Sequence, residues 1–232
     1  MSKKSILLSA LWGDGHPFDN VFDTTLPVKL PEHMDTIRKE NPDDKLALVI
    51  WGGGDISPTL YGELPSEACG AEVELSDRDK LEVALARKAF EMDIPIIGVC
   101  RGAQMVCALA GGKLVQHVTR HAGGYHDLFT SDGKLMRCPS LHHQMMYPWG
   151  LPEDEWTMLA WTPKPLSDVY YGGVENGKQV HRTLPGHEPE VIWMPKKKGL
   201  LIQSHPEFIS DLNHPFVVYT LSLTRKYVLC QD

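Results

Sequence analysis

The sequence predicts an α/β fold in which a mostly parallel central sheet gains an antiparallel extension in the second half of the chain. Short apolar runs alternate with helical patterns in the first half, whereas strand patterns separated by tight turns fill the second half. The chain has 232 residues, of which 42% are hydrophobic and 23% are charged. This size and composition suit one folded domain over residues 1–232.

The first half contains three short runs that are apolar on both faces, as parallel strands covered by helices are. Ser76 and Asp79 form a capping pattern between the last two runs and predict the start of a helix. A second helix is expected over about 102–110, ending at Gly111 and Gly112. The predicted strands are residues 6–11, 46–51 and 94–99.

The second half predicts strands of an antiparallel extension and a final helix. Asn176 and Gly177 supply the two residues with positive φ that a tight hairpin turn needs. A short basic connection over 195–198 joins two further strands. The predicted elements are strands at residues 157–162, 169–173, 179–182, 190–194 and 199–203, and a helix over about 215–229.

Composition excludes several classes of partner. Asp and Glu total 30 against 23 Lys and Arg, for a net charge of -7, so neither nucleic acid nor an anionic membrane surface is an expected partner. The apolar runs are also far shorter than the ~20 residues that span a bilayer. Five cysteines at irregular spacing argue against a disulfide framework and favour a reducing cytoplasm.

Cys100 stands between a predicted buried strand and a predicted helix, with Gly98 two residues before it and Gly102 two residues after it. A sharp strand-to-helix turn needs small neighbours to hold a nucleophile in a strained conformation. The N–H groups and dipole at the start of the helix favour a thiolate. A buried structural cysteine is the alternative interpretation, and the glycine context favours the nucleophile.

A thiolate nucleophile needs a proton donor for the leaving group and a third group that orients this donor. His205 and Glu207 offer both, directly after the predicted strand 199–203. Sites in α/β proteins gather at the carboxyl ends of strands, so we expect His205 to lie beside Cys100. Most of the eleven histidines are expected to be surface or core residues instead.

Three glycines, Gly52, Gly53 and Gly54, follow the predicted strand 46–51. Glycines let backbone N–H groups approach a ligand closely, and an oxyanion hole needs such an N–H beside the one that follows the nucleophile. The segment lacks the Gly-x-Gly-x-x-Gly pattern with a helix directly after it, so it does not predict a dinucleotide site.

These motifs resemble the class I glutamine amidotransferase-like superfamily and, within it, the peptidase C26 family of γ-glutamyl-γ-aminobutyrate hydrolases. The resemblance extends from about Leu46 to Phe208. It implies a three-layer, flavodoxin-like class I glutamine amidotransferase fold in a single domain. The matching segments are Gly52-Gly53-Gly54-Asp55-Ile56-Ser57-Pro58 with Tyr61-Gly62, Arg78-Asp79-Lys80-Leu81-Glu82, Gly98-Val99-Cys100-Arg101-Gly102-Ala103-Gln104, Gly111-Gly112-Lys113-Leu114-Val115-Gln116, His142-His143-Gln144 and Gln203-Ser204-His205-Pro206-Glu207.

The resemblance implies a role for each matching residue. Cys100 would be the nucleophile, His205 the general acid and base, and Glu207 the partner that orients His205. The backbone N–H groups of Gly53 and Arg101 would form the oxyanion hole, with Gly54 as the alternative to Gly53. The residues near the glutamyl pocket would be Gln104, His142, His143 and Gln144.

The first 45 residues match the family poorly. The segment Trp12-Gly13-Asp14-Gly15-His16-Pro17-Phe18 replaces the segment that the family usually has there, and we expect it to shape the substrate pocket.

The leading hypothesis is a cysteine hydrolase that cleaves the γ-glutamyl amide of a small-molecule γ-glutamyl amine through a glutamyl thioester, with no cofactor. Arg101 after the nucleophile resembles the hydrolase branch of the superfamily. The alternative is a free-standing glutamine amidotransferase subunit that passes ammonia to a synthetase partner. A third hypothesis is a non-catalytic binding protein on the same fold. A homodimer and a synthetase partner both stay open.

His117, His121 and His126 raise the question of a metal site. Their spacing is loose, Gly123 and Gly124 interrupt the segment, and no carboxylate or thiolate completes a ligand set. We therefore expect a solvated or substrate-lining loop and no metal.

Overall fold

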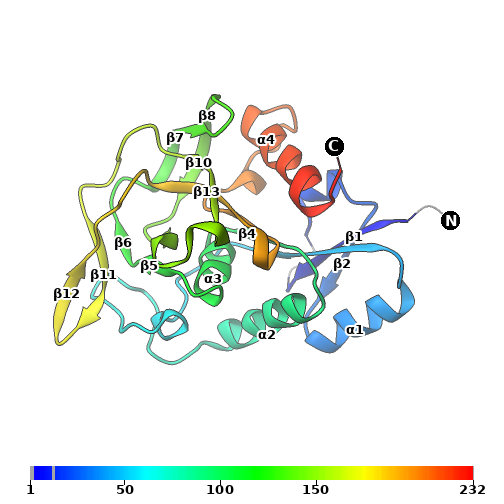
Figure 1. The fold of residues 1–232 in the computed structure, drawn as a ribbon, viewed down its shortest axis with the longest axis horizontal. Coiled ribbons are helices and arrows are strands. Elements are labelled where there is room, and N and C mark those ends of the chain that lie inside the picture. The colour runs from blue at the N-terminus through cyan, green and yellow to red at the C-terminus, as the bar shows by residue number, and fades with distance from the viewer. Residues whose placement is uncertain (1–2, 12–13, 232) are drawn as a thin grey trace.

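A nine-stranded mixed sheet forms the centre of the structure, a computed structural model that describes residues 3–11 and 14–231. Its parallel part consists, in spatial order, of β2 (Thr24–Val28), β1 (Ser5–Ala10), β3 (Lys45–Ile50), β4 (Ile96–Val99) and β14 (Gly199–Ile202). Its antiparallel part continues with β13 (Pro189–Met194), β10 (Thr157–Trp161), β7 (Ala122–Thr130) and β8 (Leu135–Leu141) (Figure 1). The mostly parallel sheet and its antiparallel extension are confirmed.

Helices cover both faces of the sheet and make three layers. In Figure 1, α1 (Pro31–Glu40) and α2 (Asp77–Glu91) lie below the sheet and α4 (Pro215–Leu223) lies above it. Side chains of successive strand residues point to opposite faces. Accordingly, Leu8 packs with residues of α1, α2 and α3 (Arg101–Leu109), whereas Leu7 packs with residues of α4.

Two smaller sheets lie beside the central one. The strands predicted at 169–173 and 179–182 form β11 (Tyr170–Glu175) and β12 (Lys178–His181). They lie outside the central sheet, because β11 pairs with β12 on one side and with β6 (His117–Val118) on the other. Their turn is the expected one, with φ of 51° at Asn176 and 73° at Gly177. The second small sheet pairs β5 (Lys113–Val115) with β9 (Met145–Tyr147).

The predicted helix ends are confirmed where local chemistry specifies them. The Ser76 side chain accepts from the Asp79 N–H, and the Asp79 side chain accepts from the Ser76 N–H, which is a complete capping box for α2. Gly111 has a φ of 98° directly after α3. The final helix is less regular than expected, because α4 ends at Leu223 and a wider π-helical turn follows over Thr224–Val228.

Sequence reasoning missed α1, β2 and the β7–β8 hairpin. Only Met34 of α1 is buried in the core, so the apolar spacing that would reveal this helix is weak. β7 contains Gly123 and Gly124, which are depleted in strands, and most of its first half is exposed.

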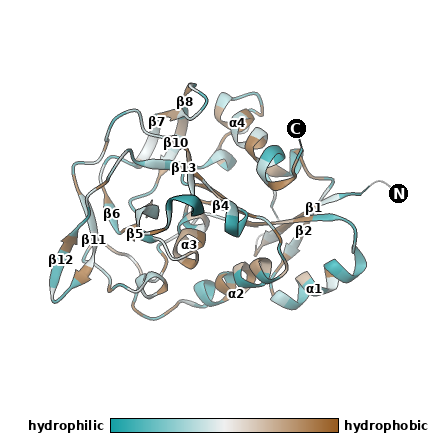
Figure 2. Cartoon of the chain, viewed as in Figure 1, coloured by the Kyte–Doolittle hydropathy of each residue, from teal (hydrophilic) through white to brown (hydrophobic). Residues whose placement is uncertain are grey.

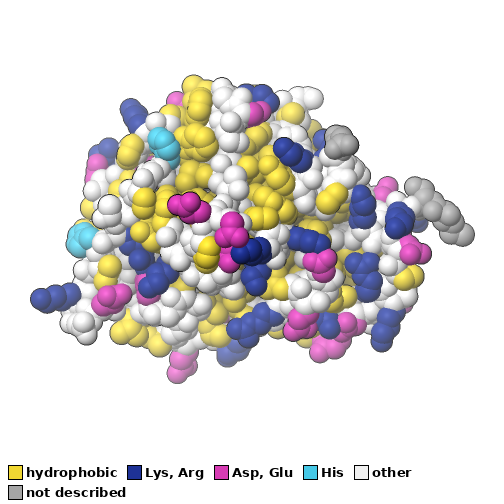
Figure 3. All heavy atoms as spheres, in the orientation of Figure 1, with side chains coloured by type: hydrophobic (Ala, Val, Ile, Leu, Met, Phe, Trp, Pro, Cys, Tyr) yellow, Lys and Arg dark blue, Asp and Glu magenta, His cyan; other side chains and the backbone are white. Residues whose placement is uncertain are grey.

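Hydrophilic and charged residues are distributed over the helices and the surface without a single large patch on the face that Figure 3 shows. α1 and α2 carry both hydrophilic and hydrophobic residues (Figure 2). On the face seen in Figure 3, Lys and Arg are interspersed with Asp and Glu rather than gathered in a patch of one sign. Every helix within residues 3–11 and 14–231 is too short or too polar to cross a lipid bilayer.

Candidate active site

Cys100 occupies a strained turn between β4 and α3. Its φ is 49° and its ψ is -107°, a conformation that L-residues rarely adopt and that clusters at functional sites. A Cβ on Gly98 would lie 2.7 Å from the backbone of Ala103, and a Cβ on Gly102 would overlap the carbonyl oxygen of Ile50. The two glycines therefore let the chain turn this sharply, as the Gly-x-Cys-x-Gly pattern predicts.

The start of α3 surrounds the sulfur with polar groups. Cys100 is the N-cap of this helix, so the free N–H groups of the first turn lie beside it. The Gln203 amide Nε2 donates to the Cys100 Sγ at 3.9 Å. Sequence reasoning missed Gln203 as a contact of the cysteine, although it directly follows β14 and precedes His205 by two residues.

His205 and Glu207 form a hydrogen-bonded pair. The His205 Nδ1 lies 2.7 Å from the Glu207 Oε1, and the Phe208 ring stacks on the imidazole with 4.6 Å between centroids. Burial disfavours charge on His205, but Cys100 and Glu207 outweigh it and raise the pKa of His205 to about 10. The imidazolium is therefore available as a proton donor at neutral pH.

The glycine loop after β3 brings the cysteine and the histidine together. A Cβ on Gly52 would lie 2.9 Å from the His205 Cε1 and 3.5 Å from the Cys100 Cβ, so both side chains border the same backbone position. The Arg78 Nη2 donates to the Gly52 carbonyl at 2.8 Å and holds the loop. Gly53 has a φ of 151°, and a Cβ there would overlap Arg78.

The Arg101 side chain points toward α2. It is buried and forms ion pairs with Glu82 and, at 2.5 Å, with Asp79, both on α2. Glu82 also pairs with Arg78 at 2.9 Å. This network joins α2, the start of α3 and the glycine loop, which gives a physical reason for the motif around residues 78–82. The part of Arg101 that faces the cysteine is its backbone.

A cavity of about 420 Å³ opens beside the histidine. Asp14 and His16, from the described part of the divergent segment 12–18, line it, and that this segment shapes the substrate pocket stays a prediction. Trp12 and Gly13 lie outside the described residues. Phe208, which sequence reasoning missed, forms part of the wall and is 57% exposed. The remaining lining residues are Trp51, Gly52, Gly53, His205 and Glu207.

The four residues predicted near the glutamyl pocket are not among those lining this cavity. The Gln104 Nε2 donates to the Gln144 carbonyl at 3.0 Å, and both side chains are buried. The His143 Nε2 lies 3.0 Å from the Asp55 Oδ1, and this pairing raises the pKa of His143. His142 packs against His121 instead, with 4.6 Å between ring centroids.

The expectation of a solvated loop is wrong for His121 and for the side chain of His126, whereas a substrate-lining role stays a prediction. The His121 side chain is fully buried and that of His126 is 8% exposed. Both point toward Glu190, which lies far away in the sequence and was therefore not recognised as a neighbour. His117 lies apart, near Tyr171 and His143.

Comparison with known sequences places these residues in context. The sequence profile of the peptidase C26 family matches residues 23–147, which include Cys100 but not His205. The glutamine amidotransferase-like protein YvdE of Lactococcus lactis is 41% identical over 172 residues, which cover 72% of this chain and 68% of that protein. A glutamine amidotransferase-like protein of Rickettsia prowazekii is 36% identical over 96 residues, which cover 40% of this chain and 32% of that protein.

Solved structures confirm the class I glutamine amidotransferase fold. A Thermoplasma acidophilum protein described as a GMP synthase component has a TM-score of 0.58 and 12% identity, covering 98% of this chain and 94% of its own. The glutaminase domain of Trypanosoma brucei CTPS, solved with bound acivicin, has a TM-score of 0.54 and 15% identity, covering 99% of this chain and 95% of that domain. A glutamine amidotransferase of Thermotoga maritima has a TM-score of 0.52 and 14% identity, covering 97% of this chain and 86% of that protein.

Proposed function

The chain belongs to the peptidase C26 family, and we propose that it is a cysteine hydrolase that cleaves the γ-glutamyl amide bond of a small γ-glutamyl amine. The observation that carries this proposal is the meeting of Cys100 and His205 at Gly52, with Glu207 hydrogen-bonded to the far side of the imidazole. A nucleophile, a base within reach and a group that orients the base are the parts that covalent hydrolysis of an amide requires.

The proposed reaction has two halves. The Cys100 sulfur attacks the γ-carbonyl carbon, and the backbone N–H groups of Gly53 and Arg101 stabilise the oxyanion, with Gly54 as the alternative to Gly53. The amine leaves with a proton from His205, and a glutamyl thioester stays on the cysteine. A water molecule, deprotonated by His205, then attacks the thioester and releases glutamate and the thiol.

Each proposed role agrees with the surroundings of the residue. The raised pKa of His205 suits the donation of a proton to the departing amine. The positive φ of Cys100 aims its side chain out of the turn, beside the N–H groups at the start of α3. Asp14 and His16 border the cavity where an amine group could lie, so they are candidates for selecting the amine.

The alternative is that the chain is a glutaminase subunit serving a synthetase, and steady-state kinetics distinguishes the two. We expect the purified chain alone to release glutamate from some γ-glutamyl amine with a kcat/KM at least about tenfold above that for glutamine, which corresponds to ~1.4 kcal/mol in the transition state. The measurement is glutamate release across glutamine and a panel of γ-glutamyl amines with neutral, cationic and anionic amine groups. If all substrates stay inert until a second protein is added, and glutamine then becomes the best, the amidotransferase hypothesis replaces this one.

A further inference from the structure

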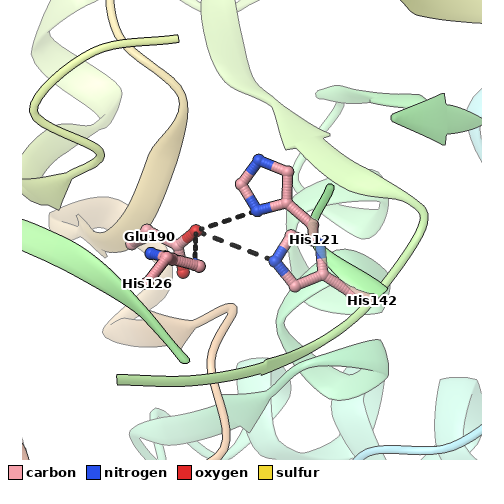
Figure 4. A group of neighbouring side chains, drawn as sticks. All are labelled: His121, His126, His142 and Glu190. Carbon is pink, nitrogen blue, oxygen red and sulfur yellow. Dashed lines mark ion pairs between the residues drawn. The ribbon is translucent and has the colours of Figure 1, made fainter. Parts of the chain in front are cut away.

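Three histidines and one glutamate converge in the interior on the far side of Ser204 from the candidate active site. This histidine–glutamate cluster consists of His121, His126, His142 and Glu190, whose ligand atoms all lie within 4.8 Å of one another. The exposed fractions of the four side chains are 0%, 8%, 1% and 0%. Figure 4 shows the three imidazole rings arranged around the Glu190 carboxylate.

Hydrogen bonds to the outer nitrogens fix the orientation of two rings. The His142 Nδ1 lies 2.9 Å from the Gln144 carbonyl oxygen, and the His126 Nδ1 lies 3.0 Å from the Asp127 carbonyl oxygen. A carbonyl oxygen only accepts, so each Nδ1 carries a proton. In the neutral ring the Nε2 then presents a lone pair, and both Nε2 atoms face the Glu190 Oε1, at 3.7 Å from His142 and 3.1 Å from His126.

The third ring lies beside a second carboxylate. The His121 Nε2 lies 3.3 Å from the Glu188 Oε2, while its Nδ1 lies 3.7 Å from the Glu190 Oε1. Glu188 is itself anchored, because it accepts from the Ser167 N–H at 2.8 Å and from the Tyr170 hydroxyl at 2.8 Å. A carboxylate behind a histidine is the arrangement that orients many metal-bound imidazoles.

Several polar atoms at the centre of the cluster have no hydrogen-bond partner within the described part of the chain. Among the residues that the structure describes, the Glu190 Oε1, the His121 Nδ1 and the His142 Nε2 are buried and have no hydrogen-bond partner. A proton on His126 would pair with Glu190 and still leave the other two nitrogens unpaired. Buried polar atoms without partners are costly, at about 1–3 kcal/mol each, so a group that satisfies all three at once is favoured.

We propose that His121 Nδ1, His126 Nε2, His142 Nε2 and Glu190 Oε1 bind one divalent transition-metal ion, with Zn²⁺ as the best fit. Zn²⁺ takes four such ligands in a tetrahedron at about 2.0–2.1 Å, which places neighbouring ligand atoms about 3.3–3.4 Å apart. The three nitrogens lie 3.1–3.7 Å from the Glu190 oxygen, close to that spacing. Three imidazoles and a carboxylate favour zinc over the hard cations magnesium and calcium.

The proposed metal would be structural rather than catalytic. Four protein ligands fill a tetrahedral shell, so no position stays open for a substrate. The second oxygen of Glu190 accepts from the Ser204 hydroxyl at 2.5 Å, and the His205 N–H donates to the Pro139 carbonyl at 3.3 Å. The ion would therefore fix β8 and β13 around the segment that carries His205.

A surface cavity borders one of the four proposed ligands. His126 and its neighbour Asp127 line a surface cavity of about 550 Å³, together with Tyr125 and Arg137. His126 is the most exposed of the four ligands, so an ion could reach the cluster past its ring. This route also makes His126 the ligand whose replacement least disturbs the interior.

The test is Zn²⁺ binding to the chelator-treated, purified chain of residues 1–232. We expect one ion per chain, competition with a chromogenic chelator at a Kd below about 0.1 µM, and a rise in Tm when Zn²⁺ is added. Co²⁺ at the same site should give the intense visible absorption of a tetrahedral complex. His142→Ala and Glu190→Gln should each weaken Zn²⁺ binding at least about 100-fold.

His117→Asn is the matched control, because His117 belongs to the same stretch of chain but lies outside the cluster; its Zn²⁺ affinity should equal that of the unaltered chain. If the variants at His142 and Glu190 do not fold, His126→Gln replaces them and should lose binding while its circular dichroism spectrum is retained. Failure of the unaltered chain to bind Zn²⁺ below about 10 µM, or equal binding by His126→Gln, would overturn the proposal.

Discussion

The candidate active site and the histidine–glutamate cluster are neighbouring buried sites built in different ways. The active site takes its residues from short motifs at the carboxyl ends of β3, β4 and β14. The cluster takes His121 from just before β7, His126 from the middle of β7, His142 from just after β8 and Glu190 from β13. The parallel strands thus carry the residues proposed to react, and the antiparallel extension carries those proposed to hold a cation.

Ser204 connects the two sites. It precedes His205, and its hydroxyl donates to the Glu190 Oε2 at 2.5 Å while lying 3.2 Å from the Cys138 Sγ. We therefore expect substitutions on the parallel side of the sheet to abolish turnover and substitutions on the antiparallel side mainly to alter stability.

The largest effect is expected from Cys100→Ala. Removing the sulfur removes the nucleophile, so glutamate release should fall at least about 10⁴-fold. The cavity left by one sulfur atom is small, and Tm should change little. Alkylation at near-neutral pH should label Cys100 ahead of Cys69, Cys107, Cys138 and Cys230, all of which are free thiols in the described part of the chain. Retained turnover in Cys100→Ala, or preferential labelling of Cys107, would remove Cys100 from its proposed role.

Gly52→Ala is expected to be the next most damaging change. The new Cβ would lie 2.9 Å from the His205 Cε1 and displace the imidazole, and a misplacement of about 1 Å can cost roughly 100-fold in rate. Gly54→Ala is the matched control, because a Cβ there meets nothing within 4 Å and the backbone N–H is kept. The measurement is the kcat/KM of both variants relative to that of the unaltered chain. Equal losses in the two would show that the position of His205 does not limit the reaction.

Glu207→Gln should have a smaller effect and a distinctive pH profile. His205→Ala removes the proton donor and should cost more than Glu207→Gln, which removes only its orienting charge. Since the pKa of His205 is raised to about 10, its imidazolium is present below that pH and is lost above it. The basic limb of kcat/KM should therefore move to lower pH in Glu207→Gln. A basic limb that stays in place would argue against their pairing in the active enzyme.

The smallest effect on rate is expected from Ser204→Ala. The change leaves a buried Glu190 oxygen without its donor, which costs about 1–3 kcal/mol and should lower Tm by roughly 2–10 °C. The kcat/KM should fall by less than about tenfold. Ser222→Ala serves as the control, because the Ser222 hydroxyl donates to the Tyr219 carbonyl in its own helix. A loss of turnover as large as that of Gly52→Ala would show that the two sites are not separable.

The sequence predicted the parts of the fold whose physical cause is local. The turn at Cys100 needs Gly98 and Gly102 within two residues, and the cap of α2 needs Ser76 and Asp79 three residues apart, so both can be recognised in a short window. The hairpin β7–β8 could not be found in that way, because its glycines and exposed side chains look like a loop until another strand pairs with it.

The sequence by itself determined four of the five strands in the parallel part of the sheet, the strained turn at Cys100 and the pairing of His205 with Glu207, because patterns within a short stretch of chain specify them. Only the tertiary structure decided that His121 and His142 are buried against Glu190, 69 and 48 residues away by their numbers. Antiparallel pairing of β7 with β8 and of β10 with both β7 and β13 brings these residues together. Strand neighbours of this kind are set by the packing of the whole sheet, and the spacing of residues along the chain does not reveal them.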